Sequence, residues 1–79
     1  MNIRVGDYVK YILSNTDEFV ILKILQINNK DFLFPYYCRI VYDSGQNYDT
    51  DLDHWKFDYG DVEILSKEDV RNEIIIDRI

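Results

Sequence analysis

Three aspartates placed at every second position are the residues of this chain best suited to chemistry. Asp49, Asp51 and Asp53 would present their carboxylates on one face of an extended strand. Such a cluster could hold a hard cation such as Ca²⁺. The calcium-binding loop requires glycine directly after the third acid, and this chain has His54 there. We therefore expect no metal site and interpret the three acids as a solvent-exposed edge.

The chain offers few groups for catalysis. Cys38 and His54 are its only cysteine and histidine, and a Cys–His nucleophile needs an activated thiolate and a third, orienting group. Cys38 stands in an alternating apolar segment, which is typical of a small core residue. The sequence has no glycine-rich phosphate loop, paired metal-binding cysteines or serine nucleophile motif. We therefore expect no enzymatic activity and no cofactor.

Residues 43–63 carry the net charge of the whole chain. They hold seven acidic side chains against one lysine, a charge of −6 that equals the total. Aromatic side chains are interleaved with these acids, and the combination suits a cationic protein surface. A sequence pI near 4.5 argues against direct contact with nucleic-acid phosphates. We expect partner binding at these residues: Asp43, Tyr48, Asp49, Asp51, Asp53, Trp55, Asp58, Tyr59 and Asp61.

Length and composition predict a single domain over residues 1–79. A hydrophobic content of 47% excludes intrinsic disorder. No stretch approaches the 18 or more apolar residues of a membrane span, and the N-terminus lacks a signal-peptide pattern. One cysteine allows no internal disulfide, which fits a reducing compartment. These features predict a soluble, cytoplasmic protein that does not bind membranes.

Apolar residues recur mostly with a period of two, which indicates β-strands. Residues 19–27 are apolar on both faces and predict a central strand. Pro35 excludes the short Phe32–Phe34 segment from a central ladder position. Ser44-Gly45 suits a hairpin turn that leads into the acidic return strand. We expect five strands, within residues 5–13, 19–27, 36–42, 46–57 and 62–65.

The last 14 residues follow a different pattern. Ser66 is a typical helix N-cap, and the acids directly after it suit the first turn of a helix. The β-branched run Ile74–Ile76 is unfavourable in a helix. The pattern predicts one or two helical turns from Lys67, followed by an apolar tail. This Ile-rich tail would pack either on the domain or on a second copy, as a homodimer contact.

These elements predict a mainly β fold: a small five-stranded barrel over residues 3–65 with a short helix or tail over 66–79. Three segments, Val5–Val9, Tyr37–Gly45 and Asp61–Leu65, resemble the first, middle and closing strands of SH3-like barrels of the Tudor and KOW kind. The resemblance covers about residues 5–65. The long second strand, the Phe32–Tyr36 segment, the acidic return strand and the tail depart from that pattern. The resemblance implies a binding module with no catalytic role.

Two functional hypotheses follow. In the first, a phage or mobile-element inhibitor mimics DNA and occupies the basic, nucleic-acid-binding site of a target such as a defence complex. Carboxylates at alternate strand positions repeat every 6.6–6.8 Å or so, close to the spacing of phosphates along an extended strand. A composition without alanine and rich in Ile, Asn, Asp and Tyr fits an AT-rich genome. The host cytoplasm would then be its location.

The alternative hypothesis is an adaptor domain of the SH3 or Tudor type. A shallow aromatic groove would bind a basic peptide, with acidic residues along its rim. The groove would be lined by Tyr8, Tyr37, Tyr42, Trp55 and Tyr59.

Overall fold

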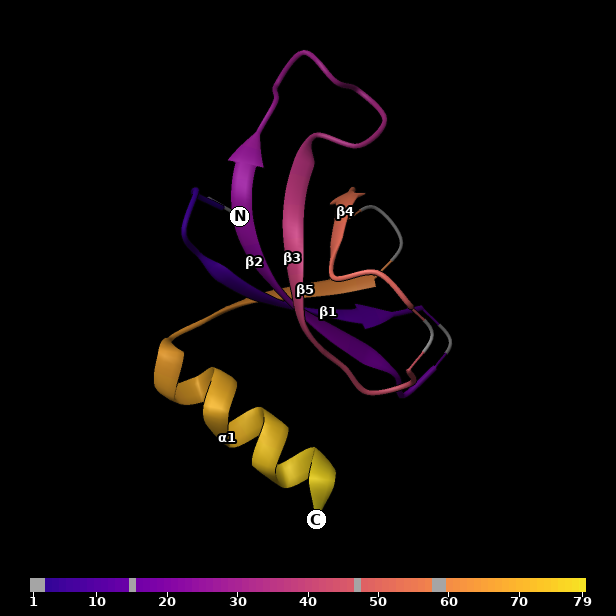
Figure 1. The fold of residues 1–79 in the computed structure, drawn as a ribbon, viewed down its shortest axis with the longest axis vertical. Coiled ribbons are helices and arrows are strands. Elements are labelled where there is room, and N and C mark those ends of the chain that lie inside the picture. The colour runs from indigo at the N-terminus through magenta and orange to yellow at the C-terminus, as the bar shows by residue number, and fades with distance from the viewer. Residues whose placement is uncertain (1–2, 15, 47, 58–59) are drawn as a thin grey trace.

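The protein is mainly β, with five antiparallel strands in one sheet and a C-terminal helix (Figure 1). The computed structural model describes residues 3–14, 16–46, 48–57 and 60–79. The five antiparallel strands and the C-terminal helix confirm the predicted, mainly β fold class. The elements are β1 (Tyr8–Leu13), β2 (Phe19–Ile27), β3 (Tyr36–Asp43), β4 (Leu52–Trp55), β5 (Gly60–Leu65) and α1 (Lys67–Arg78).

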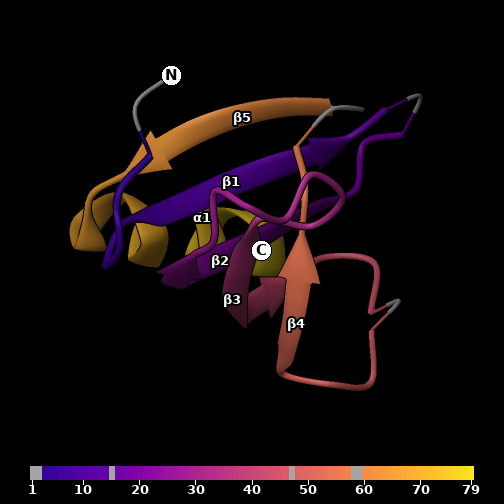
Figure 2. The ribbon, with the colours of Figure 1, turned by 90° about the horizontal axis from the view of Figure 1, so that it is seen from above.

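The sheet is curled but open. Its strand order is β4-β3-β2-β1-β5, and no pairing joins β4 to β5 within the described residues. Within the described residues the strands therefore do not close into the expected barrel, because the two edge strands, β4 and β5, do not pair. The curl nevertheless brings the two sides together, since the ring centroid of Trp55 on β4 lies 6.1 Å from that of Tyr11 on β1. Figure 2 shows β4 lying across the direction of β1 and β5.

Strand β2 is the centre of the fold and is buried on both faces. One face contributes to an inner core, enclosed by the curl of the sheet, and the other to a helix-side core beneath α1. The inner core comprises Val9, Tyr11, Val20, Leu22, Ile24, Cys38 and Trp55. The helix-side core comprises Phe19, Ile21, Leu65 and Val70.

A bulge changes the alternation of side chains along β2. The register with β3 shifts between Ile24 and Gln26, so Leu25 is an extra residue in this ladder. Ile27 therefore packs against the inner core together with Ile24, although three positions separate them. Simple alternation predicts opposite faces for these two side chains.

Helix α1 is longer than predicted, running from Lys67 through Arg78. The expectation of one or two turns followed by an apolar tail is wrong, because tertiary contacts outweigh the poor propensity of the isoleucine run. Ile74 packs against the helix-side core. Glu73 forms an ion pair with Lys10 on β1 at 2.9 Å, and Asp77 accepts a hydrogen bond from the Tyr42 hydroxyl.

The helix begins with a capping box. The Ser66 hydroxyl accepts a hydrogen bond from the Asp69 amide at 3.1 Å, and the Asp69 carboxylate accepts one from the Ser66 amide at 3.2 Å. The N-cap predicted at Ser66 is therefore confirmed. Among the described residues, no helix combines the length and the apolar character needed to cross a membrane.

Replacing the capping residue tests the contribution of α1 to stability. Ser66→Ala removes one acceptor for the helix N-terminus, and we expect it to lower the free energy of unfolding by about 1 kcal/mol. Urea unfolding followed by tryptophan fluorescence measures this change. Ser14→Ala, at an exposed turn, is the matched control and should change stability by less than about 0.5 kcal/mol. Equal effects of the two substitutions would contradict the assigned cap.

Candidate functional site

The three alternating aspartates do not share a strand. Only Asp53 lies in β4, while Asp49 and Asp51 precede it in the connection from β3. The prediction of three carboxylates on one strand face is therefore wrong. All three side chains are exposed, and none has a cationic partner among the described residues.

The Asp43 carboxylate organises the loop before β4. This strand begins at Leu52, later than the return strand predicted within residues 46–57. The Asp43 carboxylate accepts hydrogen bonds from the amides of Gly45 at 3.2 Å and Tyr48 at 2.9 Å. Gln46 adopts a positive φ of 52° within the same turn. These interactions form a wide loop in place of the tight hairpin expected at Ser44-Gly45. Asp43, predicted to bind a partner, thus contributes to the shape of the loop.

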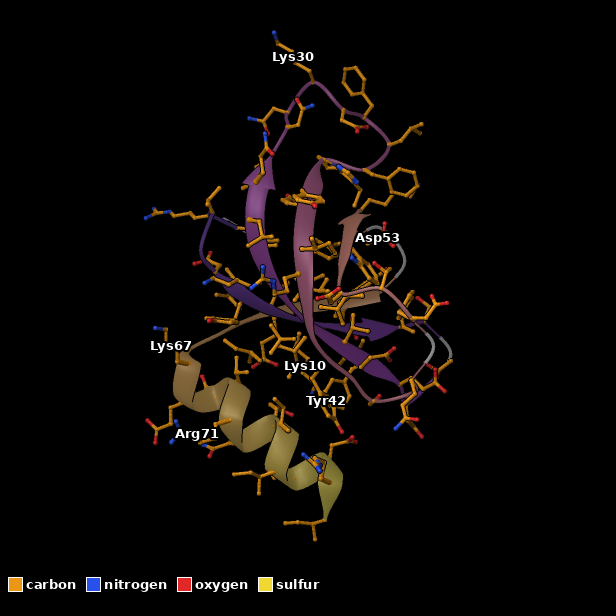
Figure 3. The ribbon with its side chains drawn as sticks, viewed as in Figure 1. Lys10, Lys30, Tyr42, Asp53, Lys67 and Arg71 are labelled. Atoms are coloured by element: carbon orange, nitrogen blue, oxygen red, sulfur yellow. The ribbon has the colours of Figure 1, made fainter. Side chains whose placement is uncertain are left out.

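Asp53 and Trp55 lie on the same face of β4. They are opposite Cys38 and Tyr36 on β3, whose side chains belong to or pack against the inner core. Trp55 is 8% exposed, whereas Asp53 is exposed. The strand therefore places a carboxylate at the rim of the inner core and an indole ring within it. Figure 3 shows Asp53 at β4, on the side of the molecule away from α1.

Aromatic side chains pack around Trp55. The Tyr48 ring lies 5.2 Å from it at 63°, and the Tyr11 ring 6.1 Å away at 87°, both edge-on. Phe57 continues the cluster, 5.2 Å from Tyr11 and 4.9 Å from Tyr36. Rings in these arrangements stabilise one another beyond the area that they bury.

A cavity of about 300 Å³ opens beside this cluster, and we call it the aromatic pocket. Its lining residues come from β1, the β2–β3 loop, the β3–β4 connection, β4 and the position directly after β4. A second hollow of about 520 Å³, lined by Asp31, Phe34, Asp53 and His54, shares three of its residues. The described residues that line the aromatic pocket are Tyr11, Leu13, Phe34, Tyr48, Asp53, His54, Trp55 and Lys56.

Among the described residues, the tyrosines predicted to line the aromatic groove do not gather around Trp55. Tyr8 and Tyr42 pack against the helix-side core, and Tyr37 lies 4.7 Å from the His54 ring. Of the predicted groove residues that the structure describes, only Trp55 lines the aromatic pocket. Tyr11 was missed, although the alternation Val9, Tyr11, Leu13 on β1 indicates a shared inner face.

The remaining predicted partner-binding residues do not all join the pocket. Asp61 lies on β5, which is at the opposite edge of the sheet order from β4. Asp58 and Tyr59 lie outside the described residues. The predicted site residues that line the aromatic pocket are therefore Tyr48, Asp53 and Trp55.

Cys38 is a core residue, as predicted. Its side chain is fully buried in the inner core. Burial, assisted by the negative charge of Asp53, raises the pKa of the thiol to about 12. The described residues contain no group of three or more His, Cys, Asp and Glu side chains arranged to hold a metal ion.

The buried thiol predicts slow chemical modification. A thiol with a raised pKa stays protonated at pH 8, and its burial blocks access, so we expect Cys38 to react with a disulfide reagent only when the inner core opens. Labelling measured against urea concentration should accelerate in parallel with unfolding. Labelling of the native protein as fast as a free thiol would contradict this burial.

A comparison of the chain with protein-family models, with curated proteins and with solved structures finds no match. We therefore infer function from the geometry of the aromatic pocket.

Proposed function

We propose that this protein is a non-enzymatic binding protein that takes a basic segment of a partner protein onto the aromatic pocket. The observation that carries the proposal is the placement of Asp53 and Trp55 on one face of β4, with Tyr48 packed on Trp55. A carboxylate at the rim of a cavity with aromatic walls matches the two halves of an arginine or lysine side chain, its charged head and its apolar stem.

The aromatic rings and the Asp53 carboxylate of the pocket each favour a cation. A guanidinium or ammonium group over an aromatic ring gains roughly 0.5–2 kcal/mol, depending on how far it is desolvated. Asp53 adds a charge-assisted hydrogen bond. Desolvation raises the pKa of the Tyr48 phenol, and so do neighbouring acids including Asp43. The phenol therefore stays uncharged at physiological pH.

The neighbouring acids extend this attraction. Asp49 and Asp51 are exposed, they precede β4, and no described cation pairs with them. With a net charge of −6, the chain attracts a basic surface before contact is made, which accelerates association at low salt.

A second candidate function uses the same surface. The exposed, unpaired carboxylates of Asp49, Asp51 and Asp53 favour an inhibitor that covers the basic, nucleic-acid-binding site of a larger protein, as expected of a phage or mobile-element inhibitor. The regular phosphate-like spacing no longer supports it, since only Asp53 lies in a strand. For this reason we favour the binding of a basic segment over inhibition of a nucleic-acid-binding protein.

Binding to an arginine–glycine peptide tests the proposal. We expect Tyr48→Ala and Asp53→Asn each to weaken binding by about 5- to 30-fold, equivalent to roughly 1–2 kcal/mol, because each removes one half of the cation site. Fluorescence anisotropy measures the affinity. Glu68→Gln removes the same charge on α1, which covers the other face of the sheet, and should alter the affinity by less than about twofold.

Two further comparisons make this test specific. A peptide with glutamine in place of arginine should not bind, and circular dichroism should show that each variant is folded. If the three variants bind the arginine peptide equally, binding is non-specific charge attraction and the pocket assignment is wrong. A variant with Asp49, Asp51 and Asp53 all changed to Asn that loses only a large basic protein, and keeps the peptide, would favour the inhibitor.

A further inference from the structure

The loop between β2 and β3 presents large apolar side chains to solvent. We call residues 28–35 the finger. Phe32 is 93% exposed and Leu33 65% exposed, and Phe34 is also exposed. The finger extends beyond the sheet at the end opposite α1, with Lys30 near its tip (Figures 1 and 3). Adjacent apolar side chains this exposed are typical of a contact surface.

The finger has a defined conformation. Its base is closed by a hydrogen bond from the Asn28 amide to the Pro35 carbonyl at 2.8 Å. The Asp31 carboxylate accepts hydrogen bonds from the amides of Leu33 and Phe34, each at 3.0 Å, and these bonds lower the pKa of Asp31. A loop that is already ordered loses less conformational entropy when it binds.

We propose that the finger of one copy occupies the aromatic pocket of a second copy, forming a twofold-symmetric dimer. Phe34 belongs to the finger and also lines the pocket, so the pocket lies at the base of the finger. A twofold axis that brings one finger to its partner's pocket also brings the partner's finger to the first pocket. The contact is therefore closed and limited to two copies.

The finger is complementary to the pocket in both polarity and charge. Phe32 supplies an aromatic ring for the space beside Tyr48 and Trp55, where edge-on ring contacts are favoured. Lys30, two residues away, supplies a cation for Asp53 at the rim. The finger thus carries the same combination of apolar and basic groups that the pocket is suited to bind.

The like charge of the two copies limits the strength of this dimer. Each copy has a net charge of −6, and this repulsion is screened over about 8 Å at physiological salt. We therefore expect a dissociation constant on the order of micromolar at 0.15 M salt, and a weaker dimer at low salt. Because the finger fills the pocket, dimerisation would compete with a basic partner.

Sedimentation velocity of the full chain tests the dimer. The wild type should change from monomer to dimer as its concentration rises from about 1 to 300 μM, spanning the expected dissociation constant. Phe32→Ser should weaken this association by about tenfold or more, since the ring leaves the pocket. The matched control is Ile76→Ser, which removes an isoleucine that is 69% exposed on α1 and should leave association unchanged.

A charge exchange tests the placement of Lys30. Lys30→Asp and Asp53→Lys should each weaken the dimer, and the double variant should recover most of the wild-type affinity. Lack of recovery would overturn the pairing of finger and pocket.

Two other results would overturn the proposal: a wild type that stays monomeric over the whole range, or association that survives Phe32→Ser. Loss of the dimer in Ile76→Ser alone would place the contact on the Ile-rich helix end. The inference does not depend on the basic partner proposed above. Peptide binding measured on Phe32→Ser, which keeps Tyr48 and Asp53, decides that question separately.

Discussion

The burial of β2 on both faces is the constraint on which the rest of the structure depends. Val20, Leu22 and Ile24 point into the inner core, while Phe19 and Ile21 point into the helix-side core. A strand that is apolar on both sides needs a cover on each, and a chain of 79 residues has little material to provide them. The curl of the sheet supplies one cover, and α1 supplies the other.

These two covers separate the face beneath α1 from the face that carries the aromatic pocket. Under α1, the Lys10–Glu73 ion pair and the Tyr42–Asp77 hydrogen bond attach the helix to the sheet. On the inner side, the curl brings Trp55 against Tyr11, and β4 does not pair with β5 within the described residues. The aromatic pocket opens beside these two rings. Its position is thus a consequence of how the inner core is closed.

Sequence patterns predicted the elements better than their contacts. The two-sided apolar run at residues 19–27, the core position of Cys38 and the cap at Ser66 follow from local rules and are confirmed. The bulge at Leu25 and the hydrogen bonds of Asp43 are not encoded in periodicity, so the side-chain faces after them were assigned wrongly. The distribution of tyrosines between the two faces likewise depends on tertiary packing, as does the full length of α1.

We propose that a basic ligand binds at the aromatic pocket while α1 has a structural role. A ¹H–¹⁵N NMR titration with an arginine–glycine peptide tests this proposal directly, because the single tryptophan lines the pocket and its buried indole N–H gives one signal. We expect the Trp55 indole signal and the amides of Tyr48 and Asp53 to shift together on saturation, with the amides of α1 unchanged. Saturable shifts centred on α1, with the indole signal unmoved, would contradict the proposal.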